Sequence, residues 1–387
     1  RKCPPRAMSK LAQRPEQSTS CRLTPMLQFD LKPVLCLDRK FRGYFADNAW
    51  TLVVGAGISK GLVPDWQDLA IAVVRHAYGT ALSDQDIQKV FKDSGWSMDS
   101  WIQAAANAFV AMGKSLEEFK DVLEEQIYSI VRTRSKGLGL ESYLTVVLND
   151  PMRAPRDRVI EVCDFLESAF PDCSVFKVAR ALSRICTHGH APRAVLTFNA
   201  DTLLETYLVL AARREHYLGP GPYNNPPSMF VQVTRSGPSN AGKIPIIHCH
   251  GALSPKPMLN HPHRDSRDRL VFLEREYLAM ASREGAWGET MFIQLAHTSK
   301  MAFIGLSMSD ANIRRWMSSV HEETLADLRS YGVGDHANPP HVWIRSKPAA
   351  PVDELFLPSL RHLGVRPGWI DTWGHLEDGL KNLAACC

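Results

Sequence analysis

Polar residues suited to acid–base chemistry follow two apolar runs in the second half of the chain. Thr197-Phe-Asn-Ala-Asp201 comes after residues 194–196, and His248-Cys-His250 comes after residues 244–247. Short apolar runs bounded by turn residues are typical of buried strands, and open α/β sheets bind ligands beyond the carboxyl ends of their strands. An imidazole has a pKa suited to a general base, so His250 is a candidate base with His248 as its neighbour in the wall of the site.

Each of these residues also has a structural explanation. Asn199 could cap a strand end, and Asp201 could be the N-cap of a helix that begins at Thr202, because both residue types favour such positions. A structural histidine is the corresponding alternative for His250.

A metal site is a further alternative for the histidines. His248 and His250 would share one face of a strand, and His261-x-His263 follows them. We do not favour this interpretation, because the intervening segment is rich in proline and no Asp or Glu is an obvious additional ligand. The nine cysteines contain no C-x₂-C pair, which excludes a four-cysteine zinc ribbon. The sequence therefore predicts chemistry without a metal ion.

Two glycine-containing segments resemble known ligand-binding turns. Val53-Val-Gly-Ala-Gly-Ile-Ser59 follows a predicted strand and precedes a predicted helix, a setting in which backbone N–H groups bind phosphate. Its glycine spacing is one residue too long for the dinucleotide fingerprint, and a tight strand-to-helix turn is the alternative. Gly305-Leu-Ser-Met-Ser309 lacks the last glycine of a hydrolase nucleophile elbow. We therefore interpret Ser307 as a sugar or phosphate contact, with Asp310 capping the helix that carries Asn312.

Strand and helix patterns alternate along the chain, which predicts an α/β fold. The expected architecture is a doubly wound, mostly parallel Rossmann-like sheet with a helical insertion module. Strands are expected at residues 51–55, 194–198, 244–248, 270–273, 301–305, 341–344 and 364–370, and helices flanking them include 274–283 and 311–319. Residues 219–262 hold nine prolines and are expected to form a long loop region broken by one or two strands.

The block 81–190 differs from the rest because its apolar residues recur with a period near 3.6. Ser83-x-x-Asp86 and Ser115-x-x-Glu118 resemble capping boxes, so the block is expected to be entirely helical. The predicted organisation is a basic N-terminal extension at 1–47, a Rossmann-like domain made of 48–80 and 191–387, and the helical insertion module at 81–190.

Composition and charge exclude several classes of protein. A hydrophobic content of 45% and a charged content of 22% are ordinary for a folded globular protein. Residues 1–42 carry ten Lys/Arg and three Asp/Glu, so the net charge of +4 leaves the main body slightly acidic and argues against direct nucleic-acid binding by it. No run approaches the roughly 18 apolar residues of a membrane span. Cysteines without framework spacing are typical of a reducing compartment, so a cytoplasmic location is expected.

Four segments, in the same order along the chain, resemble motifs of the sirtuin superfamily. Gly55-Ala-Gly-Ile-Ser59 with Val63-Pro-Asp-Trp66 resembles its GAGxS and P-D-F signature, and Thr197-Phe-Asn-Ala-Asp201 resembles its T-x-N-x-D motif. His250-Gly251 is similar to its catalytic His-Gly, and Gly305-Leu-Ser307 to a later G-x-S on a nucleotide-binding strand. Each motif falls at the carboxyl end of a predicted strand.

The sequence also departs from the deacylating sirtuins. It lacks their two C-x-x-C pairs, Gln67 replaces the arginine that usually follows P-D-F, and the helical block separates the first two motifs. With residues 270–277 and Gly305-Leu-Ser-Met-Ser-Asp-Ala-Asn312, these features resemble the prokaryotic sirtuin-like proteins of antiviral defence, whose domain cleaves NAD. The resemblance implies an NAD glycohydrolase (NADase) that forms nicotinamide and ADP-ribose or cyclic ADP-ribose.

The resemblance assigns catalytic roles to Asn199 and His250. Asn199 would orient water or the nicotinamide ribose and so favour the oxocarbenium-like transition state, and His250 would be the base toward a ribose hydroxyl or water. The residues expected to bind NAD as the substrate are Gly55, Ala56, Gly57, Ser59, Asp65, Trp66, Thr197, Asp201, Gly305, Ser307 and Asn312.

The sequence leaves two other functions open. One is a regulatory subunit that senses NAD or ADP-ribose without turnover, and the other is an NAD-dependent protein deacylase, which the missing zinc ribbon disfavours. The resemblance further implies a homo-oligomer with a separately encoded partner, such as a ring-forming DNA-translocating ATPase. The basic extension and the proline-rich region 219–262 are the candidate contacts.

Overall fold

A seven-stranded parallel sheet forms the centre of the structure, a computed structural model. The basic extension at 1–47, most of the region 219–262 and the pair His261 and His263 lie outside the residues that it describes. All described residues belong to the compact unit Val34–Cys387. They are residues 49–79, 82–219, 230–233, 243–255, 267, 269–282, 286–332, 339–348 and 358–384.

The strand order is β3-β4-β2-β1-β5-β6-β7, with β1 (Trp50–Val54) between β2 (Ala194–Thr197) and β5 (Lys300–Ile304). All strand pairs are parallel, so the predicted doubly wound sheet is confirmed. Strands β2 to β4 lie on one side of β1 and β5 to β7 on the other, so the strand order reverses at β1 and the carboxyl end of β1 is the expected ligand crevice. The outer strands are β3 (Phe230–Val233), β4 (Ile244–His248), β6 (His341–Ser346) and β7 (Val365–Ile370).

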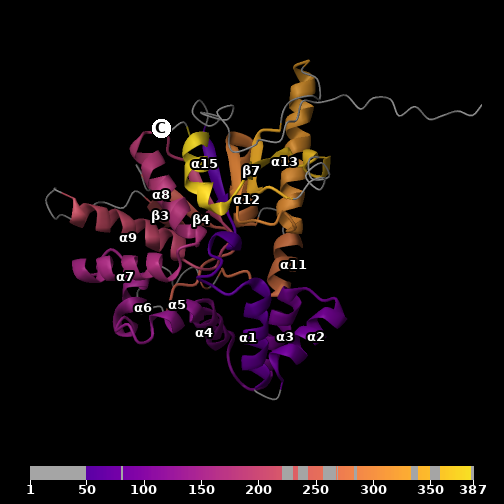
Figure 1. Cartoon of the computed structure of the whole chain (residues 1–387). Coiled ribbons are helices and arrows are strands. Elements are labelled where there is room, and N and C mark those ends of the chain that lie inside the picture. The colour runs from indigo at the N-terminus through magenta and orange to yellow at the C-terminus, as the bar shows by residue number, and fades with distance from the viewer. Residues whose placement is uncertain are drawn as a thin grey trace, which may run out of the picture. The chain divides into compact units, whose positions relative to one another are not determined.

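Helices cover both faces of the sheet because alternate side chains of β1 enter two different apolar clusters. Leu52 and Val54 belong to a cluster with residues of α1 (Trp66–Tyr78), α8 (Ser174–Thr187), α9 (Leu203–Leu218) and α15 (Leu376–Leu383). Val53 belongs to the other, with residues of α12 (Trp287–Thr298) and α13 (Ala311–Ser330). In Figure 1, α8 and α15 lie on one side of the strands and α12 and α13 on the other.

The predicted helical module is present, and no strand occurs among the described residues from 82 to 190. Both capping boxes form, since Ser83 and Ser115 accept from the backbone N–H groups of Asp86 and Glu118 and their own N–H groups donate back. Besides α8, its helices are α2 (Asp84–Ser94), α3 (Met98–Ala111), α4 (Leu116–Ile127), α5 (Ser129–Ser135), α6 (Glu141–Asn149) and α7 (Arg156–Ala169).

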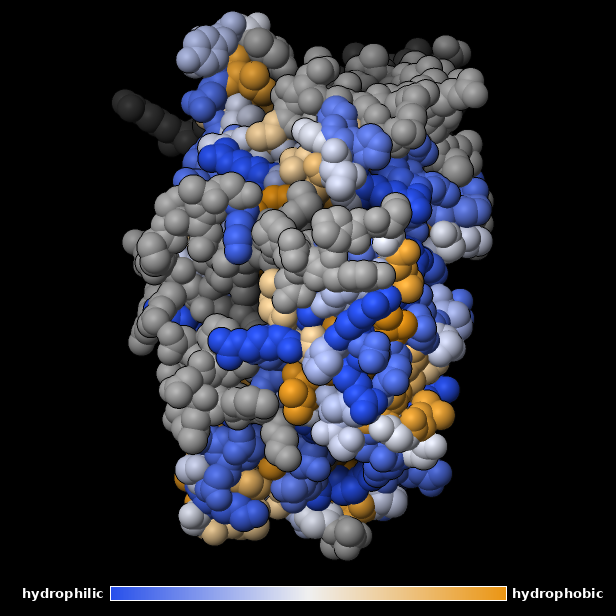
Figure 2. All heavy atoms as spheres, turned by 90° about the vertical axis from the view of Figure 1, so that its left-hand side faces the viewer, coloured by the Kyte–Doolittle hydropathy of each residue, from blue (hydrophilic) through white to orange (hydrophobic). Residues whose placement is uncertain are grey.

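Ion pairs connect helices of this module to the rest of the unit. Arg214 of α9 binds Glu167 of α7 at 2.8 Å, and Arg180 of α8 binds Glu377 of α15 at 3.1 Å. The described part of the face that includes α7 to α9 is mainly hydrophilic, with scattered hydrophobic residues (Figure 2). Because such partly exposed pairs contribute little each, the buried apolar clusters are the main support of this interface.

The prediction of a strand at 270–273 is wrong. These residues are buried but form a loop before α11 (Glu274–Ser282), because the N–H groups of Phe272 and Leu273 donate to the Glu276 carboxylate at 2.8 and 2.9 Å. A short apolar run does not by itself distinguish a strand from a buried loop. Helix α13 also extends beyond its predicted range of 311–319.

Candidate functional site

A cavity of about 800 Å³ lies at the carboxyl ends of the central strands. Its wall combines the loops after β1, β2, β4 and β5 with the start of α1 and parts of α3 and α11. Volumes of about 300–1,000 Å³ are usual for small-molecule sites. The cavity therefore occupies the place, and has the size, that the sheet topology predicts for a ligand site.

The structure brings most of the predicted site residues to this wall. Those that line the cavity are Asn199, His250, Gly55, Ala56, Trp66, Asp201, Gly305, Ser307 and Asn312. Four predicted ligand-binding residues are absent from the described lining: Gly57, Ser59, Asp65 and Thr197. Asp65 is exposed and caps α1 by accepting from the N–H of Asp68, and Thr197 accepts from the N–H of Asn199.

The glycine-rich loop does not lead directly into an α-helix, which corrects the sequence-based expectation. A short 3₁₀ turn, η2 (Ala56–Ile58), follows β1, and α1 begins only at Trp66. Gly57 donates to the carbonyl of Gly305 at 2.9 Å, and a Cβ on Gly57 would lie 2.8 Å from that oxygen. The glycines thus allow the loops after β1 and β5 to touch, which supports the alternative of a tight turn for their spacing.

Asn199 is held by side chains behind the wall and keeps one polar atom free. It is buried, and its Nδ2 donates to Ser59 Oγ at 3.3 Å, while Ser59 Oγ donates to Asp201 Oδ1 at 3.3 Å. Asn199 Oδ1 has no hydrogen-bond partner within the protein. A buried amide oxygen without a partner is costly unless a ligand or water completes it, so this atom marks a position for a donor.

The N-cap of α9 is Thr202 and not, as the sequence suggested, Asp201, but Asp201 lies on the cavity wall just before this helix. Its Oδ1 accepts from the N–H of Leu203, the first residue of α9, and its side chain also lines the cavity. Burial raises the pKa of Asp201 to about 6, although the hydrogen bond from Leu203 favours the ionised form. The carboxylate is therefore mostly ionised at neutral pH and becomes neutral in mildly acidic solution.

His250 is buried between two aromatic rings. The rings of Phe198 and Tyr277 meet it edge-on, with centroids 5.0 and 5.3 Å away, and its Nε2 has no hydrogen-bond partner. Burial lowers the pKa of His250 to about 4, and the charge of Asp310 opposes this only in part. The imidazole is thus neutral at physiological pH and free to accept a proton, but it is a weaker base than the sequence suggested, because a general base works best with a pKa near the working pH.

His248 is not a neighbour of His250 in the wall, which corrects the sequence-based expectation. It is absent from the described lining; its Nε2 lies 2.8 Å from Glu205 Oε1 and its Nδ1 lies 3.2 Å from the carbonyl of Asn199. Burial is the largest single influence and lowers the pKa of His248, but the Glu205 carboxylate, the Asn199 carbonyl and Asp201 together outweigh it, so the pKa is raised. His248 therefore supports the Asn199 loop from behind.

The pKa values of the two imidazoles should be shifted in opposite directions, upward for His248 and downward for His250, and NMR of the histidine ring Cε1–H signals can measure this. We expect His248 to gain its proton above pH 6.5 as the pH falls, whereas His250 stays neutral until the pH approaches 4. Spectra of the His248→Gln and His250→Gln variants assign the signals. A His250 midpoint at or above 6.5 in the folded protein would contradict the described environment.

Several lining residues were not found by sequence reasoning. Ser97 and Asp99 come from the start of α3 in the helical module, and Tyr277 comes from α11. No local pattern around them indicates a ligand, because only tertiary packing brings them to the cavity. Asp310 was identified as a helix cap, which the structure confirms by its hydrogen bonds from the N–H groups of Asn312 and Ile313.

The described parts of the chain also bear on metal binding and on the membrane. They contain no group of three or more His, Cys, Asp or Glu arranged to hold a metal ion. The four described cysteines, Cys163, Cys173, Cys186 and Cys249, are buried and not in disulfides. No helix within the described ranges is both long and apolar enough to cross a membrane.

In a comparison with known protein families, residues 193–360 match a family described as the SIR2-like domain. The matched segment runs from β2 past β6 and contains both Asn199 and His250. The match covers less than half of the chain and supports a likeness to the sirtuin-like superfamily. No curated protein matches the chain.

Proposed function

We propose that this protein is an NAD glycohydrolase with Asn199 and His250 as its catalytic residues. The best support for the proposal is that the wall of one cavity carries two groups together: the neutral, buried imidazole of His250 and the buried amide oxygen of Asn199, which has no hydrogen-bond partner. The SIR2-like match over the same residues supports NAD as the ligand. Both residues lie where the loops after β2 and β4 meet the crevice of the sheet.

The reaction needs little more than these groups. The bond between the ribose C1′ and the nicotinamide nitrogen breaks, its electron pair stays on the nitrogen, and the cationic ring leaves as neutral nicotinamide. Water then adds to C1′ and loses its proton to His250, so that NAD⁺ and water give nicotinamide, ADP-ribose and a proton. Asn199 would orient this water or the ribose; attack by a group of the same molecule instead would give cyclic ADP-ribose. A polar group placed beside the developing charge lowers the barrier because it favours the transition state over the substrate.

The wider role that we propose is bacterial antiviral defence through depletion of cytoplasmic NAD. Since unrestrained cleavage would harm the host, we further propose a homo-oligomer controlled by a separately encoded partner, such as a ring-forming DNA-translocating ATPase. The basic extension at 1–47 and the region 219–262 are the proposed contacts. These features rest on the sequence resemblance.

An assay with two substrates separates this function from its alternatives. Purified protein is incubated with NAD and an acetylated peptide, with and without a chelator, and nicotinamide and deacetylated peptide are followed separately. We expect nicotinamide release that is insensitive to chelation, an unchanged peptide, and loss of activity in the His250→Ala variant. Binding of NAD without release would favour a sensor, peptide deacetylation a deacylase, and loss of activity with removal of stoichiometric zinc a metal enzyme.

A further inference from the structure

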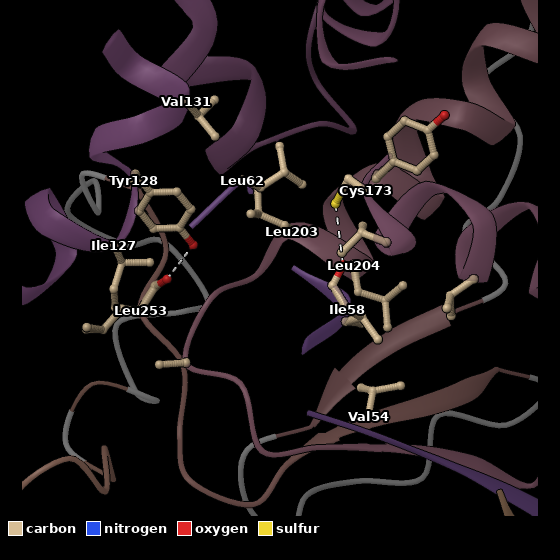
Figure 3. Close-up of a cluster of buried hydrophobic side chains, with 14 of the residues drawn as sticks. Val54, Ile58, Leu62, Ile127, Tyr128, Val131, Cys173, Leu203, Leu204 and Leu253 are labelled. Carbon is tan, nitrogen blue, oxygen red and sulfur yellow. Dashed lines mark hydrogen bonds between the residues drawn. The ribbon is translucent and has the colours of Figure 1, made fainter. Parts of the chain in front are cut away.

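Tyr128 of the helical module contacts two of the loops that surround the proposed active site. It is the residue after α4, and only 1% of its surface is exposed. Figure 3 shows its ring among buried apolar side chains, with its hydroxyl directed at Leu253. Tyr128 does not line the described cavity, so any effect on chemistry must act through other residues.

The hydroxyl of Tyr128 connects the two loops that carry the proposed catalytic residues. It donates to the carbonyl of Leu253 at 2.7 Å, three residues after His250, and accepts from the N–H of Thr202 at 3.0 Å, three residues after Asn199. Thr202 Oγ1 lies 3.2 Å away. One phenolic hydroxyl thus satisfies a buried carbonyl and a buried N–H from different loops.

The same two loops meet directly at this point. The N–H of Leu253 donates to the carbonyl of Ala200 at 2.7 Å, and Leu253 pairs with Asp201 in a short parallel bridge. Burial raises the pKa of Tyr128, so its proton is retained for the bond to Leu253. With that proton used, the Thr202 hydroxyl has to donate to the phenolic oxygen.

A second contact from the module supports the glycine-rich loop in a similar way. The thiol of Cys173, the N-cap of α8, donates to the carbonyl of Ile58 in η2 at 3.4 Å (Figure 3). Burial raises the pKa of this thiol to about 12, so it stays protonated and can donate. The module therefore contacts three of the loops that surround the cavity.

We infer that Tyr128 is a positioning residue that fixes the Asn199 loop and the His250 loop relative to each other. The catalytic meaning of this inference rests on the proposed function, whereas the positioning itself does not. The Tyr128→Phe variant removes one oxygen and leaves the Leu253 carbonyl and the Thr202 N–H without their buried partner. The loops then shift to satisfy these groups, and small displacements of reacting groups reduce kcat strongly.

The matched control is Tyr207→Phe, since Tyr207 is also 1% exposed but its hydroxyl donates to Glu167, outside the described lining. We expect both variants to lose some thermal stability, but only Tyr128→Phe to lower kcat for NAD cleavage, by about 10- to 100-fold with KM changed less than about threefold. Equal kcat values in the two variants would overturn the inference.

NMR provides a readout that does not depend on turnover. The side-chain amide of Asn199 and the ring Cε1–H of His250 should shift in Tyr128→Phe and stay in place in Tyr207→Phe. If the wild-type protein cleaves no NAD, the proposed function fails, but these shifts still test the positioning role of Tyr128. Unchanged signals in Tyr128→Phe would overturn that role. If Tyr128→Phe does not fold, Thr202→Val replaces it, since it removes one contact to the phenol and should shift the same signals less.

Discussion

Replacement of His250 or Asn199 by alanine should lower kcat for NAD cleavage by about 10²–10⁴-fold in a protein that stays folded. Both side chains are buried, at 4% exposure for His250 and 5% for Asn199. Each nevertheless holds a buried polar atom without a partner, His250 Nε2 and Asn199 Oδ1. Truncation removes that unsatisfied atom and enlarges an existing cavity, so the stability loss should be below the roughly 2–5 kcal/mol of a core deletion.

The control for these variants is a buried histidine away from the cavity. His341 lies at the start of β6, the opposite end of the sheet from the cavity, and its Nδ1 accepts from the N–H of Met301. His341→Gln should cost stability but keep the turnover per folded molecule. His248→Ala is unsuitable as a mild control, because His248 holds the Asn199 carbonyl and Glu205. Unchanged turnover in folded His250→Ala and Asn199→Ala would refute the proposed mechanism.

The Gly305→Ala variant should show the largest loss of stability, about 2–5 kcal/mol, together with loss of NAD cleavage. Gly305 has a φ of +69°, which costs an alanine about 1–2 kcal/mol. Its Cβ would also lie 2.7 Å from the N of Ile58 and 2.9 Å from the carbonyl of Gly55. Relief of this overlap adds about 1–3 kcal/mol and pushes apart the loops after β1 and β5. Urea denaturation with a parallel activity assay measures both effects.

Gly95→Ala separates the conformational cost from the overlap. Gly95 ends α2 with a φ of +67°, nearly that of Gly305, but a Cβ there would meet nothing within 4 Å. The Gly95→Ala variant should lose only about 1–2 kcal/mol of its free energy of unfolding and keep full activity. Equal losses of stability in the Gly305→Ala and Gly95→Ala variants would contradict the close contact between the loops after β1 and β5.

The central strands and the site loops after them could be predicted from sequence because their signals are local. The apolar runs at β1 and β5 are followed directly by Gly55 and Gly305. Those at β2 and β4 are followed two residues later by Asn199 and His250, and all four of these residues line the cavity. The capping boxes of α2 and α4 are equally local, since they depend on residues three apart.

The remaining features depend on contacts between distant segments. The apolar residues 270–273 suggested a strand, but the Glu276 carboxylate takes their N–H groups. The alternation of His248 and His250 suggested one shared face, yet β4 ends at His248 and the chain turns before His250. Tyr277 and Asp99 reach the cavity only because α11 packs against α3, where Ser100 donates to Glu274 at 2.7 Å.

The most direct test of NAD glycohydrolase activity is a product balance in one tube of wild-type protein, NAD and acetylated peptide, followed by proton NMR. We expect nicotinamide to appear in step with the sum of ADP-ribose and its cyclic form, NAD to be lost by the same amount, and the acetyl signal of the peptide to stay unchanged. Nicotinamide release that is matched by acetyl loss from the peptide would contradict this activity. So would an NAD concentration that stays constant while titration shows NAD bound to the protein.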